Sequence, residues 1–187
     1  MKITIVGIGY VGLSLALLLS QKYEVVAYDI DKKKVNMINK HVSPINNEEI
    51  KNYFKTKALN LKATCNYQKA FINSSYIIIC TPTNYNEETN SFDTSSIEIT
   101  INKIKEINSS SIIIVRSTVP IGYTKLISNK YKSLKIIFSP EFLREDSALY
   151  DNLYPSRIII GEKTSDAKKI AYLFKECAKK KMFQFYI

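Results

Sequence analysis

Three glycines near the N-terminus mark the segment whose residue types and spacing could do chemistry most directly. The hexapeptide GIGYVG fits the pattern G-x-G-x-x-G, after an apolar run and at the start of a helix-favouring stretch. In this setting Gly7 permits a tight turn, Gly9 lets the backbone approach a pyrophosphate, and Gly12 lets helix and strand pack closely. The free amides and the dipole of a helix N-terminus favour bound phosphate. We therefore predict a dinucleotide site here that includes Tyr10 and Val11, rather than a glycine turn without a ligand.

An acidic side chain at the end of the next apolar run completes this pattern. Asp29 lies 17 positions beyond Gly12, where a carboxylate accepts hydrogen bonds from the adenosine ribose hydroxyls. A carboxylate there repels a 2′-phosphate, so the sequence favours NAD over NADP. Lys32, Lys33 and Lys34 follow closely and could soften that preference. For Lys32 and Lys33 we favour a solvated first turn of a helix.

Two further polar segments follow apolar runs and are candidates for the same site. They are TPTN at residues 81–84 and RSTVP at residues 116–120. Ligands of open parallel sheets sit outside the carboxyl ends of the strands, where these hydroxyls and prolines are expected. Ordinary turn chemistry explains the same residues equally well, so the residues alone leave both interpretations open.

The hydrophobic pattern alternates between short apolar runs and helical periodicity along the chain. It predicts strands at 3–7, 23–29, 61–65, 76–81, 111–118, 135–139, 157–161 and 182–187, and helices at 11–21, 31–40, 50–57, 96–107, 123–131 and 165–180. Continuous apolar strands separated by helices predict a mostly parallel sheet with helices on both faces, a doubly wound, Rossmann-like α/β fold. The polar stretch 83–94 is expected to be a long functional loop.

The composition limits the classes of partner that we expect for the chain. The 187 residues carry a formal net charge of +10, but only Arg116, Arg144 and Arg157 are arginines. Nucleic-acid readers commonly use arginine for bidentate contacts, so we expect no nucleic-acid partner and interpret the charge as a solvated surface that helps attract a polyanionic small molecule. The apolar stretch 11–19 is too short and too interrupted to span a membrane. A cytoplasmic protein without a membrane partner is the expectation.

The three cysteines do not suggest a metal site or a disulfide framework. Cys65, Cys80 and Cys177 are odd in number and widely spaced. We expect three reduced thiols, at least two of them buried in strands, and no bound metal.

Several longer motifs in a fixed order resemble one family. With GIGYVGLS, TPTNYN, RSTVPIG and SPEFLRE, residues 1 to about 180 closely resemble the N-terminal, NAD-binding half of the UDP-glucose 6-dehydrogenases of the UDP-glucose/GDP-mannose dehydrogenase family. The stretch YDNLYPSRI resembles the bacterial members and favours UDP-glucose over the UDP-N-acetylmannosamine of related enzymes. The resemblance implies oxidation of the C6 alcohol of UDP-glucose to a carboxylate, with two NAD molecules reduced in each turnover.

The resemblance also implies roles for individual residues. Val11 and the glycine turn would hold the pyrophosphate, Asp29 and Lys34 would contact the adenosine ribose, and Thr83 and Thr118 would line the nicotinamide end. The substrate-binding residues would be Glu141, Phe142, Leu143, Arg144 and Glu145. Thr118 and Glu145 would be catalytic, because they would position water and transfer protons, and Glu145 would also contact the cofactor.

Each of the three charged residues of this segment also has a structural interpretation besides its functional one. Glu145 could be a carboxylate stabilised by a helix N-terminus, although the motif favours a functional role. Glu141 could contact the sugar or start a helix. Arg144 could orient a neighbouring carboxylate or form a surface salt bridge.

Some parts of the family pattern are missing from this sequence. The family forms covalent intermediates on a cysteine within a glycine-rich segment of the C-terminal half, together with a lysine and an asparagine. The central helix that forms the family's homodimer and the C-terminal UDP-binding domain would also be absent. We therefore expect residues 1–187 to form one NAD-binding domain that is inactive alone. The alternatives are a truncated, non-catalytic NAD-binding paralogue and, least favoured, a basic nucleic-acid-binding protein.

Overall fold

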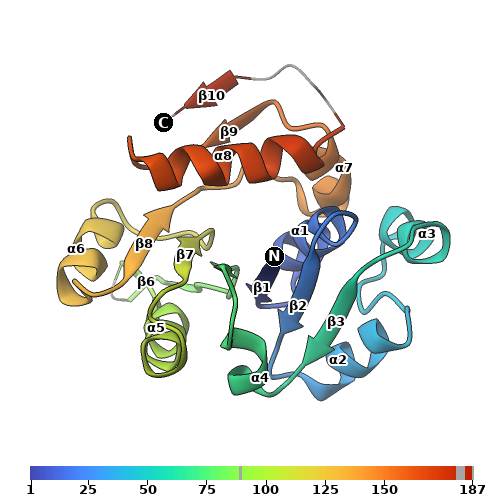
Figure 1. Ribbon diagram of the computed structural model, residues 1–187, viewed down its shortest axis with the longest axis horizontal. Coiled ribbons are helices and arrows are strands. Elements are labelled where there is room, and N and C mark those ends of the chain that lie inside the picture. The colour runs from blue at the N-terminus through green and yellow to red at the C-terminus, as the bar shows by residue number, and fades with distance from the viewer. Residues whose placement is uncertain (89, 180–183, 187) are drawn as a thin grey trace.

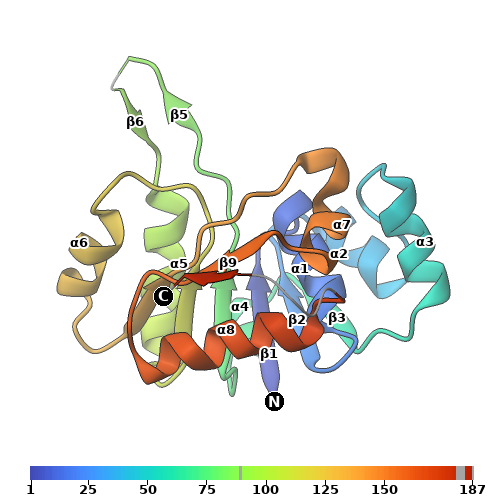
Figure 2. The same cartoon turned by 90° about the horizontal axis from the view of Figure 1, so that it is seen from above.

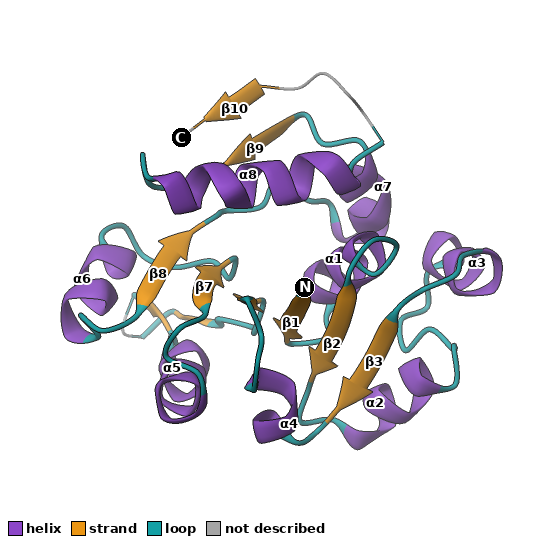
Figure 3. Cartoon of the chain, viewed as in Figure 1, coloured by secondary structure: helices purple, strands orange, loops and turns teal. Residues whose placement is uncertain are grey.

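The sheet at the centre of the protein has six parallel strands. The computed structural model describes residues 1–88, 90–179 and 184–186. The strand order is β3-β2-β1-β4-β7-β8 (Figure 3), which is the order of doubly wound dinucleotide-binding folds. The strands are β1 (Lys2–Val6), β2 (Glu24–Tyr28), β3 (Leu61–Thr64), β4 (Tyr76–Ile79), β7 (Ile112–Val115) and β8 (Lys135–Phe138). The predicted parallel, Rossmann-like sheet is confirmed, and its order reverses between β1 and β4.

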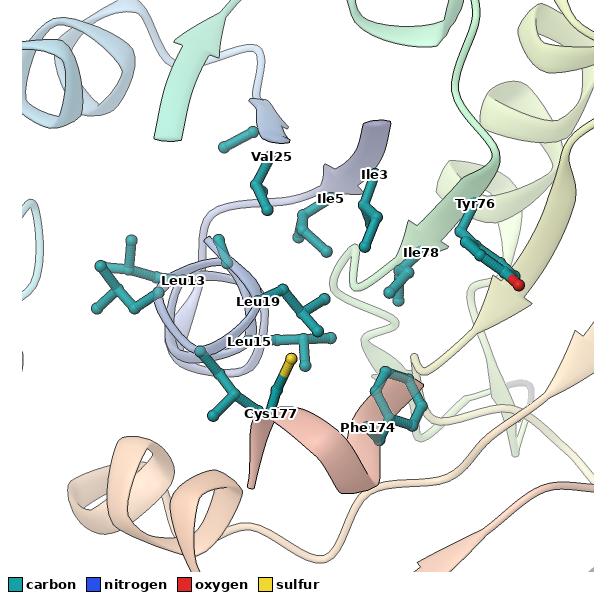
Figure 4. Packing of buried hydrophobic residues seen from close by; sticks show 14 of the residues in the cluster. Ile3, Ile5, Leu13, Leu15, Leu19, Val25, Tyr76, Ile78, Phe174 and Cys177 are labelled. Atoms are coloured by element: carbon teal, nitrogen blue, oxygen red, sulfur yellow. The ribbon is translucent and has the colours of Figure 1, made fainter. Parts of the chain in front are cut away.

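Helices cover both faces of this sheet (Figure 1). Strand residues alternate between the faces, so Ile3 and Ile5 belong to one apolar core and Val6 to the other. The first core includes side chains of α1 (Tyr10–Leu19), α2 (Lys32–Asn39), α3 (Glu48–Thr56), α7 (Ala148–Leu153) and α8 (Ser165–Cys177), and the second those of α4 (Tyr67–Phe71), α5 (Ser95–Ile107) and α6 (Tyr123–Lys130). In the first core, Phe174 of α8 lies near Leu15 of α1 (Figure 4).

The end of the chain forms a second, smaller sheet. Strands β9 (Arg157–Ile159) and β10 (Gln184–Tyr186) pair in parallel with each other and are not part of the central sheet. In Figure 1 they lie on the outer side of α8. Part of the predicted last strand, residues 182, 183 and 187, lies outside the described residues, as does residue 180 at the end of the predicted helix 165–180.

The segment 83–94 is not only a loop, as the sequence suggested. It contains the short antiparallel strands β5 (Tyr85–Asn86) and β6 (Ser91–Phe92). The rings of Tyr85 and Phe92 meet edge to face with centroids 5.1 Å apart, a geometry that stabilises cross-strand pairs. The resulting hairpin projects from the body of the protein (Figure 2).

Candidate functional site

The glycine turn adopts a conformation that side chains would obstruct. Gly7 has φ +93°, and a Cβ placed on it would lie 2.7 Å from the carbonyl oxygen of Cys80. A Cβ on Gly12 would lie 1.9 Å from the carbonyl oxygen of Gly7. Gly9 is different, because a Cβ there would meet nothing within 4 Å. Two glycines therefore serve the packing of the turn, and the third faces open space in front of it.

The start of α1 leaves room and hydrogen-bond donors for a phosphate. Gly9 is its N-cap and has no side chain that could cap the first amides. The first turn of α1 also contains no acidic residue. An uncapped helix N-terminus beside open space fits the pyrophosphate of a dinucleotide.

The carboxylate of Asp29 is held directly beside this turn. Its Oδ2 accepts a hydrogen bond from the amide of Ile8 at 2.6 Å, and its Oδ1 accepts one from the amide of Asp31 at 2.9 Å. The Nζ of Lys34 donates to the carbonyl of Ile8 at 3.2 Å. Each oxygen of Asp29 keeps a lone pair for the vicinal hydroxyls of a ribose. Lys33 and the preceding lysine are exposed in the first turn of α2, as expected.

A cavity of about 870 Å³ opens at the carboxyl ends of the strands, where the strand order reverses. This cavity, called the dinucleotide cavity below, has the size and position expected of a ligand site. Of the residues predicted for the cofactor and substrate, those that line it are Gly7, Gly9, Tyr10, Val11, Asp29, Lys34, Thr83, Thr118, Glu141 and Glu145. Gly12 lies behind the turn instead, as its contact with Gly7 requires.

Hydrogen bonds between the strand-end loops shape the wall opposite the turn. The hydroxyl of Thr83 donates to the carbonyl of Thr118 at 2.7 Å. The hydroxyl of Ser117 donates to the carbonyl of Thr81 at 2.6 Å, and Ser96 of α5 donates to the hydroxyl of Thr81 at 2.9 Å. The two segments whose role the sequence left open therefore form one connected wall of the dinucleotide cavity.

The segment after β8 divides between two cavities. Glu141 and Glu145 line the dinucleotide cavity, whereas Phe142, Leu143 and Arg144 line a second cavity of about 280 Å³ that Glu141 also reaches. The sequence grouped these five residues at one substrate surface. Because three consecutive residues, 142–144, line the second cavity, the division follows the path of the loop and not a strand-like alternation.

Local contacts of the charged residues distinguish between the alternatives raised above. Glu141 lies in a loop and not at a helix start, and its carboxylate accepts from the amide of Leu143 at 2.7 Å. Glu145 is exposed and begins the 3₁₀ turn η1 (Glu145–Ser147). Arg144 forms a two-pronged ion pair with Asp151, with Nε–Oδ2 and Nη2–Oδ1 distances of 3.2 and 2.8 Å. Arg144 therefore matches the second of its two interpretations, a surface salt bridge, and its partner is Asp151.

A buried contact fixes this segment relative to the glycine turn. Asn152 of α7 donates from Nδ2 to the hydroxyl of Ser14 at 2.9 Å, and Ser14 in turn donates to the carbonyl of Tyr10. Both side chains are buried, where an unmet polar group is costly. The helix that begins at the turn and the helix that follows Glu145 are therefore held in register.

Arg116 is the residue that sequence reasoning undervalued. It is 9% exposed and lines both cavities, and its Nη1 donates to the hydroxyl of Ser139 at 3.2 Å. Burial lowers its pKa from the usual value, while nearby Cys80 and Glu141 raise it. Guanidinium remains charged under all ordinary conditions. A positive charge therefore lies beneath the wall between the two cavities. In the sequence, only the fact that residue 116 is an arginine indicated this role.

The three cysteines are free thiols. Cys80 directly follows β4 beneath the glycine turn, and burial raises its pKa to about 12. Burial also raises the pKa of Cys177 to about 11. The expectation that two cysteines lie inside strands is wrong: Cys65 and Cys80 follow strands and are half-buried, while Cys177 is buried on α8. Raised pKa values oppose the thiolate form that nucleophilic catalysis needs.

The described ranges, 1–88, 90–179 and 184–186, contain neither a cluster of metal-binding side chains nor a helix that could span a membrane. No group of three or more His, Cys, Asp or Glu side chains there could hold a metal ion. Within the same ranges, no helix has the length and apolar character needed to cross a membrane.

The fold and the site together define the class of protein. A six-stranded parallel sheet in this order, with a glycine turn, an anchored acid on β2 and a cavity at the switch point, defines a Rossmann-like dinucleotide-binding domain. Residues 1–178 match the UDP-glucose/GDP-mannose dehydrogenase family, NAD binding domain. The chain belongs to this family, and NAD is the cofactor that its binding domain takes.

Characterised relatives and solved structures agree with this assignment. The chain is 52% identical over its whole length to a UDP-glucose 6-dehydrogenase of Campylobacter jejuni, of which it covers 48%, and 49% identical over 96% of its length to one of Streptococcus pneumoniae, of which it covers 46%. All of the chain superposes on 47% of the UDP-D-ManNAc dehydrogenase from Pyrococcus horikoshii, with a TM-score of 0.85 and 26% identity. It spans about half the length of the curated relatives it matches.

Proposed function

We propose that this chain is the NAD-binding half of an enzyme that oxidises UDP-glucose to UDP-glucuronate. The observation that carries the proposal is the dinucleotide cavity, which has the glycine turn and Asp29 at one side and Glu141 and Glu145 at the other. The relatives at 52% and 49% identity are UDP-glucose 6-dehydrogenases, which supports UDP-glucose over other nucleotide sugars.

The residues of the cavity have distinct roles in this proposal. The α1 N-terminus holds the pyrophosphate, and Asp29 with Lys34 holds the adenosine ribose. The wall formed by Thr83 and Thr118 confines the nicotinamide end. When bound, NAD supplies the acceptor for hydride from the substrate alcohol.

The acidic residues of the cavity provide proton transfer in the same proposal. Glu145 is exposed, lines the cavity and has no side-chain partner among the described residues, so its carboxylate is available to accept a proton or to orient water. Thr118, also exposed at the cavity, orients that water. Glu141 is held through the amide of Leu143, which suits a residue that positions the sugar.

Turnover is proposed to need residues beyond those of this chain. The thiols of Cys80 and Cys177 are poor nucleophiles because burial raises their pKa values to about 12 and about 11. The homodimer of the family and its UDP-binding domain would supply the remaining contacts. The chain alone should therefore bind NAD and produce no NADH from UDP-glucose at a normal enzymatic rate.

An NMR titration of the NAD-saturated chain tests the proposal. UDP-glucose should shift amide signals of residues 141–145, and UDP-N-acetylmannosamine should shift them less at equal concentration. Stronger shifts with UDP-N-acetylmannosamine would assign the chain to the related enzymes. If NAD binds normally but neither sugar nucleotide moves these signals, the chain is an NAD-binding module without a substrate surface.

A further inference from the structure

The second cavity gathers a residue type that is scarce in this chain. It lies between α7, β9 and α8, and Leu15, Leu18 and Phe174 form its apolar side. All three arginines of the sequence, Arg116, Arg144 and Arg157, line it, whereas the described lining contains no lysine. We call this the arginine cavity. The surface charge of the protein comes almost entirely from lysine, so this concentration of guanidinium groups is a separate feature.

Arg116 presents an unmet donor in this cavity. The residue is more than nine-tenths buried, and its Nε has no hydrogen-bond partner in the described structure. Its guanidinium lies over the ring of Phe174, 5.1 Å from the centroid, and its Nη1 is bound to Ser139. A buried guanidinium N–H without a partner is unfavourable. The ring and Ser139 fix the orientation of the group, and the buried Nε–H requires an acceptor from a ligand or solvent.

Arg157 provides a second positive charge at the mouth of the arginine cavity. It is exposed and stacks on Phe142, with Cζ 4.8 Å from the ring centroid. Among the described residues no carboxylate lies within ion-pair distance of Arg157, whereas Arg144 is neutralised by Asp151. With Glu141 also in the lining, three guanidinium groups face two carboxylates. The arginine cavity therefore keeps an uncompensated positive charge.

We propose that the arginine cavity binds a phosphate group through Arg116 and Arg157. Stacked, planar guanidinium groups suit the tetrahedral oxygens of phosphate, and a volume of about 280 Å³ admits one such group. The site is separate from the glycine turn, because the phosphates of a dinucleotide bind at the N-terminus of α1. Arg116 and Glu141 line both cavities. A phosphate bound in the arginine cavity therefore lies on the other side of these two residues from the dinucleotide cavity.

Titration of the NAD-saturated chain with inorganic phosphate tests this site. Saturation with NAD removes the glycine turn as a competing phosphate site, and calorimetry then measures the remaining binding. Arg157→Gln should weaken phosphate binding by about tenfold, the value of one charge-assisted hydrogen bond. Lys163→Gln removes the same charge from an exposed residue that lines neither cavity, and should change the affinity by less than about twofold.

A second variant separates loss of the site from loss of the fold. Arg157→Lys keeps the charge of this exposed residue, which lies outside the dinucleotide cavity, but removes the planar guanidinium group, so phosphate binding should fall while NAD affinity and the melting temperature stay close to the wild-type values. Equal weakening by Arg157→Gln and Lys163→Gln would show a diffuse surface effect and overturn the proposal. Phosphate binding that NAD abolishes, or acetate binding as tight as phosphate, would also overturn it. Normal NAD binding in any of these cases leaves the proposed function intact.

Discussion

The hydroxyl of Thr83 donates a hydrogen bond of 2.7 Å to the backbone carbonyl of Thr118, which joins the loop after β4 to the loop after β7. These strands are neighbours in the sheet, and the amides of Arg116 and Ser117 donate to the carbonyl of Ile79 at the end of β4. Beyond that point, side-chain hydroxyls connect the two loops. The position of one wall of the dinucleotide cavity thus depends on a few hydroxyls, those of Ser117, Ser96 and Thr83, of which the Thr83 hydroxyl joins the two loops farthest from the strands.

Removal of that hydroxyl should weaken cofactor binding more than folding. Thr83→Val keeps the shape of the side chain but cannot donate, and we expect NAD affinity to fall about three- to tenfold, the value of one neutral hydrogen bond. Thr83→Ser is the matched control and should bind nearly as the wild type does. Calorimetry measures both affinities, and equal affinities for Val and Ser would show that the loop connection has no role in binding.

Substitutions at two glycines of the turn should distinguish a role in packing from a role in NAD binding. A Cβ on Gly12 meets the carbonyl oxygen of Gly7 at 1.9 Å, so Gly12→Ala should lower the free energy of unfolding by about 2–4 kcal/mol and abolish NAD binding. Gly9→Ala places its methyl group in open space. It should leave stability within about 0.5 kcal/mol of wild type yet weaken NAD binding, because the methyl group occupies the approach of the pyrophosphate.

Urea unfolding and NAD titration check both glycine variants. Tight NAD binding by Gly9→Ala would show that the pyrophosphate does not lie against this turn. A fully stable Gly12→Ala would contradict the close contact between the start of α1 and the end of β1.

Asp29 should determine the choice between the two nicotinamide dinucleotides. The wild-type chain should bind NAD at least about tenfold more tightly than NADP, because the carboxylate repels a 2′-phosphate. Asp29→Asn should weaken NAD binding by about tenfold and reduce the preference. Glu87→Gln removes one negative charge from a residue outside the cavity lining and is the control. An unchanged preference in Asp29→Asn would assign discrimination to other residues.

Alkaline pH should destabilise the protein through the thiols of Cys80 and Cys177. In the folded state burial raises the pKa of Cys80 to about 12 and that of Cys177 to about 11, whereas unfolded thiols titrate near about 8.5. The unfolded chain therefore releases these protons first, so stability is full below about pH 8.5 and falls as the pH rises toward 12. Urea unfolding at several pH values should show a smaller alkaline loss in Cys80→Ala than in the wild type. Equal losses would mean that Cys80 does not contribute.

Much of the fold could be predicted because the pattern that encodes it is local. Runs such as residues 76–79 and 112–115 are apolar on both faces, which is typical of central parallel strands. The short helices α4 and α7 were missed, because five or six residues give too few turns for a helical period to be recognised. The hairpin of β5 and β6 was missed because its strands have only two residues each.

The candidate site likewise contains features that the sequence could predict and features that it could not. The glycine turn and Asp29 could be placed from sequence because each is defined by its position relative to a neighbouring strand. The separation of Glu145 from Arg144 into different cavities, and the gathering of Arg116 and Arg157, depend on segments far apart in the chain. No local pattern reports such contacts, and the buried position of Arg116 follows only from how α8 packs on the sheet.

A crystal structure of the chain soaked with NAD and UDP-glucose would show where both ligands bind in the dinucleotide cavity. We expect the pyrophosphate against the amides at the start of α1, the adenosine ribose on the carboxylate of Asp29, and the nucleotide sugar beside residues 141–145. A dinucleotide bound elsewhere, or ordered NAD at the turn with the sugar nucleotide away from Glu141 and Glu145, would contradict this expectation.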